Sequence, residues 1–186
     1  MKDLFRREIA SYAWSHRDRI NGWMHIIGNP ILFIAVVLPF CLAPVTIFGL
    51  QTSLAPLLVI PALIVWISFD LGIGLAIVAS SIPLLWIAAA IAGHVSAASV
   101  WIIAAALFVV GWALQIIGHK VFEHNWPSLL RDPLHMLMSP MYVFAKLFVA
   151  LNLRSDLAAL IAQPAPQRSF APLYPGEPQA DVGRPP

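Results

Sequence analysis

The sequence has little charge and almost no cysteine. Only 11% of its 186 residues are charged and 60% are hydrophobic, whereas about a quarter of a soluble domain is charged. The stretch from Ile20 to His119 contains a single charged side chain, Asp70. The only cysteine, Cys41, excludes an internal disulfide and a cysteine-rich zinc site. The composition therefore predicts an integral membrane protein, whose apolar block is far too long for a cleaved signal segment.

Lysine and arginine are absent from the whole apolar block. Five of the eleven precede it and six follow it. Basic residues that flank membrane spans mark the cytoplasmic side, so we expect both termini to be cytoplasmic and the number of spans to be even. The sequence outside the block shows no dense basic stripe with interleaved aromatic residues, so no nucleic-acid partner is expected.

The apolar block divides at polar or glycine-containing breaks into four segments. A spanning helix needs about 20 apolar residues, and backbone in lipid must satisfy its own hydrogen bonds, which favours helices. We therefore predict an all-α integral membrane fold with about four transmembrane helices: Ile26 to Phe48, Thr52 to Ile67, Ile73 to Ala92 and Ala97 to Ile117. The second segment is short and contains Pro56 and Pro61. An alternative with three spans buries Asp70.

The regions on either side of the block also contain helical patterns. Apolar residues recur at helical spacing before it and predict an N-terminal interfacial helix: Leu4, Phe5, Ile9, Tyr12 and Ala13. After it, Asp132-Pro133 and Ser139-Pro140 suit helix starts, and the apolar stretch from Pro140 to Asn152 is too short to cross. We expect short interfacial or re-entrant helices there. Residues 1–153 should form one membrane-embedded domain, and the proline-rich residues 154–186 a disordered tail.

The predicted topology sorts the six histidines. His94 falls in the loop between spans three and four, on one side of the membrane. The other five share the opposite side: His16, His25, His119, His124 and His135. His16 and His25 are nine residues apart, which places them on opposite faces of a straight helix. They converge only if the chain bends between Asp18 and Gly22.

A metal site is the interpretation that these positions favour. Gln115, His119 and Glu123 are four residues apart and so follow one helix face. Asn21 precedes His25 by one turn and can orient it through its side chain. The predicted ligands are His16, His25, His119 and Glu123, with His135 as an additional candidate and Asn21 and Gln115 as supporting residues. This donor set suits iron or zinc, and the spacing does not separate the two.

Other interpretations of the same residues remain open at this point. Each histidine can instead be an interfacial residue with its ring tip in the headgroups. Glu123 can be a solvated charge at a helix end, and Gln115 can form a hydrogen bond between helices.

Two motifs in the chain resemble the signatures of the 2-hydroxy fatty acid dioxygenase family, and the resemblance extends over about Tyr12 to Leu151. The first motif is His16-x4-Asn21-x3-His25-x2-Gly28-x-Pro30. The second is Trp112-x2-Gln115-x2-Gly118-His119-x2-Phe122-Glu123-x3-Pro127. The chain departs from the fungal pattern in two places. Lys146 stands where that pattern carries a glutamate, and the segment from Pro127 to Pro140 is one residue shorter.

The resemblance implies an iron(II)-dependent membrane enzyme that uses dioxygen to shorten a 2-hydroxy fatty acid by one carbon, with release of carbon dioxide. By position, His16, His25 and His119 take the family's histidines, and Asn21, Gln115 and Glu123 are their companions. Many relatives are bacterial, which places the enzyme in the bacterial inner membrane with its site at the cytoplasmic interface.

The implied substrate is consistent with such a site. A 2-hydroxy acid can chelate iron through its carboxylate and hydroxyl oxygens, while its acyl chain stays between the spans. Arg17, Arg19 and Arg131 are candidates for pairing with the carboxylate. The rival functions are a zinc-dependent lipid hydrolase, a small transporter and a structural membrane protein. A transporter should show polar groups at the bilayer midplane or an internal repeat, and neither occurs.

Overall fold

The computed structural model describes residues 2–127 and 132–162, which are mostly helical. Its elements, in chain order, are α1 (Lys2–Trp14), α2 (Arg19–Val37), the 3-10 helix η1 (Leu38–Leu42), β1 (Pro44–Ile47), β2 (Leu50–Ser53), α3 (Leu54–Phe69), α4 (Leu71–His94), α5 (Ala97–Ile117), the π-helix η2 (Gly118–Phe122), α6 (Leu134–Ala150) and α7 (Ser155–Ala162).

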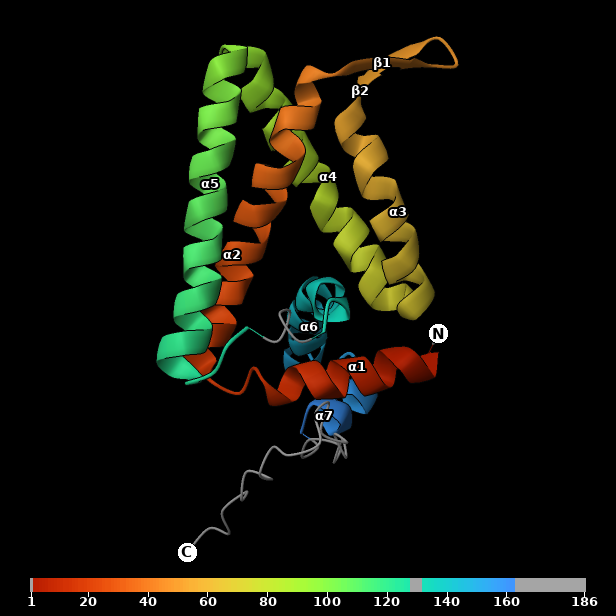
Figure 1. The fold of residues 1–186 in the computed structure, drawn as a ribbon. Coiled ribbons are helices and arrows are strands. Elements are labelled where there is room, and N and C mark those ends of the chain that lie inside the picture. The colour runs from red at the N-terminus through yellow and green to blue at the C-terminus, as the bar shows by residue number, and fades with distance from the viewer. Residues whose placement is uncertain (1, 128–131, 163–186) are drawn as a thin grey trace, which may run out of the picture.

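Four long helices run alternately up and down between two ends of the molecule (Figure 1). At one end the β1–β2 hairpin joins α2 to α3, and a short turn joins α4 to α5. At the other end α3 turns into α4, α2 begins and α5 finishes. Helices α1, α6 and α7 gather at this second end. The described segments that the sequence assigned to one side of the membrane therefore lie at one end of the molecule.

Three helical segments of the described chain are long and apolar enough to cross a membrane: Arg19–Leu42, Leu71–His94 and Ala97–Phe122. The predicted second span is helix α3, which has only 16 residues. Helices α6 and α7 add a fourth candidate if this pair, bent by 119°, is counted as one span. The long helices expose large apolar side chains such as Trp86, Ile102 and Val109, as helices in contact with lipid do.

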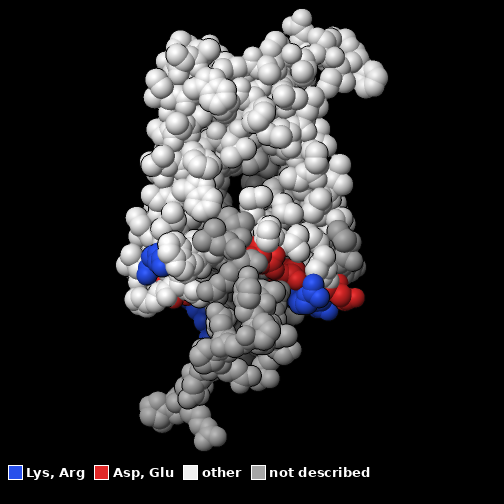
Figure 2. Space-filling view, in the orientation of Figure 1, with Lys and Arg blue, Asp and Glu red and all other residues white. Residues whose placement is uncertain are grey.

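The charged residues follow the same division. In Figure 2 the acidic and basic side chains form a band at the level of α1, and the surface beyond that band, toward the hairpin, carries none on this face. The molecule thus has one charged end and one apolar body.

Asp70 marks the turn between α3 and α4. Its side chain caps α4 by accepting from the Ile73 N–H at 3.0 Å and forms two hydrogen bonds with the Arg154 guanidinium, at 3.1 and 3.0 Å. Just after the turn, a Cβ on Gly74 would lie 2.5 Å from the Ile67 Cα, so the close packing of the two helices requires glycine there. Asp70 is therefore a capping residue between two helices and not part of a continuous span.

Three local predictions were wrong. The first predicted span does not continue to Phe48, and the fold is not purely helical, because η1 ends at Leu42 and a β-hairpin follows. Prolines at positions 39 and 44 remove backbone donors, β-branched residues favour strand, and Gly49 takes the positive φ of the turn. Ser139-Pro140 does not begin a helix, since α6 starts at Leu134.

Only the start of the expected tail, residues 154–162, is described. Its first residues form helix α7, whose Leu157 is buried in a hydrophobic cluster with residues of α1 and α6. Burial of an apolar side chain offsets the entropy of ordering this short helix. Residues 163–186 lie outside the described residues.

Candidate metal centre

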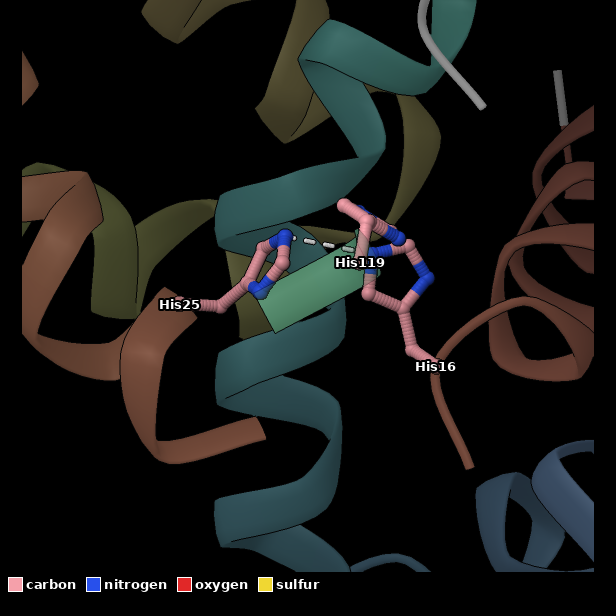
Figure 3. Close-up of side chains that lie close together, drawn as sticks. All are labelled: His16, His25 and His119. Atoms are coloured by element: carbon pink, nitrogen blue, oxygen red, sulfur yellow. Dashed lines mark hydrogen bonds between the residues drawn. The ribbon is translucent and has the colours of Figure 1, made fainter. Parts of the chain in front are cut away.

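Three histidines meet at the charged end of the molecule. His16 lies in the loop after α1, His25 in α2, and His119 in the π-helix after α5. All three are buried, and one ring nitrogen from each lies within 4.8 Å of the others. Figure 3 shows the three rings turned toward one another from separate elements. The sequence predicted this convergence.

A bend in the chain makes the convergence possible. Helix α1 ends at Trp14 and α2 begins at Arg19, and the Asp18 side chain caps α2 by accepting from the N–H groups of Ile20 and Asn21. An aspartate at this position satisfies donors that the first turn of a helix leaves free. The bend occupies residues 15–18, slightly before the predicted stretch from Asp18 to Gly22, and brings two histidines that are nine residues apart to one point.

Hydrogen bonds fix the ring orientations of two histidines. The His16 Nδ1 lies 2.8 Å from the Tyr12 carbonyl oxygen, and the His25 Nδ1 lies 3.0 Å from the Asn21 carbonyl oxygen. A carbonyl can only accept, so each Nδ1 carries a proton and donates it. The Nε2 atom of each neutral ring then presents a lone pair.

These two Nε2 atoms are 3.2 Å apart (dashed line in Figure 3). Two lone pairs at this distance repel each other unless a cation lies between them. Within the described residues, the buried His119 Nδ1 also has no hydrogen-bond partner. Three buried imidazoles whose nitrogens face one another are a donor set that fits iron(II) or zinc(II).

Electrostatics keep His16 in the form that binds metal. Burial lowers the pKa of His16 well below its ordinary value, and the neighbouring His25 and His119 lower it further. At neutral pH the ring is therefore uncharged, and a neutral imidazole is the ligand form.

Two tyrosines that the sequence did not assign to the site support His16. The Tyr12 ring stacks on the His16 ring with centroids 3.7 Å apart, and the Tyr142 hydroxyl donates to the His16 carbonyl oxygen at 3.0 Å. Tyr12 precedes His16 by one helical turn, so its spacing was a usable signal. Tyr142 comes from α6, 126 residues away, and no local pattern indicates it.

Glu123 lies beside the histidine group but does not join it. Its Oε1 accepts from the Asp18 N–H at 2.7 Å and from the Asn21 side-chain amide at 3.2 Å. It therefore holds the loop that carries His16 against the first turn of α2. Asn21 acts differently from the prediction too, because its backbone carbonyl orients His25 while its side chain binds Glu123.

The π-helix explains the displacement of Glu123. The Glu123 N–H donates to the Gly118 carbonyl, five residues back. Residues four apart therefore no longer lie directly above one another. Gly118 is itself required, because a Cβ at this position would collide with the Asn21 side-chain oxygen. The glycine of the second motif therefore allows η2 to approach α2.

The remaining candidate residues lie elsewhere. Gln115 donates to the Asn29 side-chain oxygen at 3.1 Å, which is the interhelical hydrogen bond considered as its alternative role. His135 is buried near Glu8 and Asp132. His124 is exposed, and His94 ends α4 at the opposite end of the molecule.

The basic residues considered in the sequence analysis lie outside the histidine group. Arg17 and Arg19 are exposed, and Arg131 lies outside the described residues. The Lys146 ammonium lies 5.4 Å from the centroid of the Tyr142 ring.

An apolar cavity of about 750 Å³ opens beside the histidines, and a hollow between the helices is visible in Figure 2. His25 and His119 line the cavity at the charged end, and Val37 lines it near the far end of α2. Val37 follows His25 by twelve positions, which corresponds to a rise of about 18 Å at about 1.5 Å per residue. The cavity thus extends from the histidine group deep into the apolar body.

A family model described as 2-hydroxy-palmitic acid dioxygenase Mpo1-like matches residues 3–151. The chain belongs to this family. No curated protein and no solved structure matches it significantly. The match to the Mpo1-like family covers both motifs and all three converging histidines, and the family's description names a dioxygenase acting on a 2-hydroxy fatty acid.

Proposed function

We propose that this protein is an iron(II)-dependent dioxygenase that shortens long-chain 2-hydroxy fatty acids by one carbon and releases carbon dioxide. The observation that supports this most directly is the continuity of the histidine group with the apolar cavity, which both His25 and His119 line. A polar metal-binding end joined to a long apolar chamber matches a substrate with one polar head and one acyl chain.

In this proposal His16, His25 and His119 hold the metal, and Glu123 acts by fixing the loop or as a further ligand. The hydrogen bonds from His16 to Tyr12 and from His25 to Asn21 keep the ligand nitrogens directed at one point. Iron(II), when bound, supplies the activation of dioxygen, which redox-inert zinc does not.

The cavity is long enough to hold a long acyl chain. An extended chain advances about 1.3 Å per methylene, given carbon–carbon bonds of about 1.5 Å, so a length of about 18 Å takes about fourteen carbons. The apolar walls exclude water from the chain and orient the head group toward the histidines. The site then lies at the cytoplasmic face of a membrane, which we place as the bacterial inner membrane, with both termini on that side.

The proposed reaction balances with one molecule of dioxygen as the oxidant and needs no external reductant, because the 2-hydroxy acid supplies the electrons. A 2-hydroxy acid, R–CHOH–COOH, plus O₂ gives R–COOH, CO₂ and H₂O. The bond between the carboxyl carbon and the hydroxyl-bearing carbon breaks, and the latter carbon is oxidised to the new carboxyl group.

The test is turnover by the detergent-purified protein. Protein loaded with iron(II) under oxygen, given 2-hydroxyhexadecanoic acid, should yield pentadecanoic acid, detected by mass spectrometry, whereas zinc-loaded protein should yield none. Hydrolysis of a lipid ester by zinc-loaded protein, without any shortened acid from the iron form, would replace the oxygenase with a zinc hydrolase. Protein that binds no metal at all would contradict both.

A further inference from the structure

A small polar patch borders the apolar cavity just beyond the histidine group. It consists of Asn29 on α2, Gln115 on α5 and Ser139 on α6, all of which line the cavity. The Asn29 side-chain oxygen accepts from the Gln115 amide at 3.1 Å and from the Ser139 hydroxyl at 3.0 Å. Asn29 follows His25 by four residues on the same α-helix, so it lies about 6 Å farther into the apolar body.

The hydrogen bonds of this polar patch leave one donor unused. Both bonds to Asn29 end on its side-chain oxygen, which fixes the orientation of the amide group. The Asn29 Nδ2 is buried and has no hydrogen-bond partner within the part of the chain that the structure describes. A buried polar group without a partner costs free energy. A tie between helices therefore does not account for the whole amide, whereas a ligand that brings an acceptor into the cavity does.

The packing around the polar patch holds the Asn29 amide in place. A Cβ on Gly28 would lie 2.9 Å from the Gln115 Nε2, so a side chain there would displace the Gln115 amide from Asn29. Gly28 belongs to the first sequence motif and Gln115 to the second. The hydrogen bond between Asn29 and Gln115 thus forms where the two motifs meet. Each of its two residues is four positions from a histidine of the candidate metal centre.

The rest of the cavity wall limits which acceptor fits. No lysine, arginine, aspartate or glutamate among the described residues lines the cavity, so a carboxylate that enters it finds no basic side chain there. A carboxylate has two oxygen atoms, and the one that does not face the histidines needs a separate donor. We propose that Asn29 binds the head group of the acid by donating from Nδ2 to one carboxylate oxygen. This inference rests on the proposed function, which supplies the acid.

The contact predicts selectivity for an acid over a neutral head group. A hydrogen bond to an ionised acceptor is about twice as strong as one between neutral groups. Loss of the Asn29 donor should therefore weaken binding of the acid more than binding of a neutral analogue. A suitable analogue of 2-hydroxyhexadecanoic acid is 1,2-hexadecanediol, which keeps the chain and an oxygen on each of the first two carbons but carries no charge.

The experiment measures binding to the zinc-loaded, full-length protein in detergent, in which the proposed oxidation does not occur. Each ligand competes with a fluorescent fatty acid, and the result is the preference for the acid over the diol. Asn29→Leu should lower this preference about tenfold. Asn29→Asp keeps the oxygen that accepts from Gln115 and Ser139 but replaces the donor with a second oxygen, so it should lower the preference further. Ser80→Ala, the matched control, removes a cavity-lining hydroxyl that already donates to the Ile77 carbonyl, and should keep the preference.

A measurement on wild-type protein keeps the test independent of how the variants fold. The chain contains four asparagines, so isotope labelling of asparagine nitrogen gives few side-chain amide signals in an NMR spectrum. The Asn29 signal is identified by its proximity to Gln115 and Ser139. Its protons should shift downfield when the acid binds, and by less when the diol binds.

The outcomes separate this inference from the proposed function. A preference that stays unchanged in both Asn29 variants, or an Asn29 signal that does not respond to the acid, overturns the inference and leaves Asn29 as a tie between α2, α5 and α6. Turnover by the iron form together with that result retains the dioxygenase and rejects only the Asn29 contact. A lowered preference without turnover by the iron form retains the Asn29 contact and makes the cavity a binding site for fatty acids.

Discussion

The two ends of the helical bundle differ in almost every physical property. The end formed by α1, α6 and α7 carries the charged band, the buried histidines and the part of the cavity that His25 and His119 line. The opposite end consists of the β-hairpin and the α4–α5 turn, where His94 is exposed and its Nδ1 lies 2.7 Å from the Ala90 carbonyl oxygen of its own helix. A histidine becomes a candidate ligand through convergence with others in a buried place, and His94 lies apart from the three that converge.

The largest expected effect is the difference between losing a histidine at the charged end and losing His94 at the opposite end. His25→Ala or His119→Ala should lower both iron binding and turnover by at least about 100-fold, because each removes a ligand, a larger loss than the tenfold to 100-fold typical of supporting residues. His94→Ala should change neither by more than about twofold. Bound iron per protein and product formation are the measurements. Comparable losses in all three variants would remove the distinction between the ends.

Two variants of Glu123 distinguish a role in fixing the His16 loop from a role as a metal ligand. If it fixes the His16 loop through the Asp18 N–H, an amide oxygen can still accept that hydrogen bond, so Glu123→Gln should retain most activity. Glu123→Ala should lose about tenfold to 100-fold. Activity and iron affinity of the two variants decide the matter, since a direct ligand role predicts severe losses in both.

The cavity connects the two ends, and its far part should control chain length. Leu58 lines it from α3, so Leu58→Trp should fill space there and reduce turnover of long 2-hydroxy acids about tenfold relative to shorter ones. Ile60→Trp changes an exposed residue of the same helix that does not line the cavity and serves as the control. Competition between acids of different length measures the preference, and an unchanged preference in Leu58→Trp would separate the cavity from the acyl chain.

The smallest expected effect concerns Asp70, a charged residue at the α1–α6–α7 end that stabilises the fold and is not part of the candidate metal centre. Burial disfavours the ionised form of Asp70, but hydrogen bonds from Arg154 and the Ile73 N–H outweigh it and hold the pKa of this carboxyl below its ordinary value. Its stabilisation is therefore present above the unfolded-state pKa and is lost as the pH falls through the folded value. Asp70→Asn should lower the free energy of unfolding by about 1–3 kcal/mol at neutral pH.

Thermal unfolding between pH 3 and 7 tests this expectation. The difference between wild type and Asp70→Asn should shrink toward the acid end. A difference that stays constant across this range would exclude the ion pair as its cause.

The sequence predicted those features that depend on composition or on the spacing of neighbours. The absence of lysine and arginine between Ile20 and His119 indicated the apolar helices, and the polar stretch around Asp18 indicated the bend that joins His16 to His25. The sequence could not indicate the hydrogen bond from Tyr142 to His16, because it depends on how α6 packs against the loop. It also could not indicate the hydrogen bond from the Asp18 N–H to Glu123, because the spacing of four assumed a regular α-helix.

The π-helix at Gly118–Phe122 limits which changes in length this part of the chain accepts. Five residues there complete a turn that an α-helix completes in fewer, so loss of one residue would let the hydrogen bonds return to the ordinary pattern. Local backbone energy would favour that deletion. Yet each residue of an α-helix turns the chain by about 100°, and the deletion would swing Glu123 away from the Asp18 N–H. Deletion of one residue would therefore give a more regular helix. The extra residue is what keeps Glu123 bonded to the loop that carries His16.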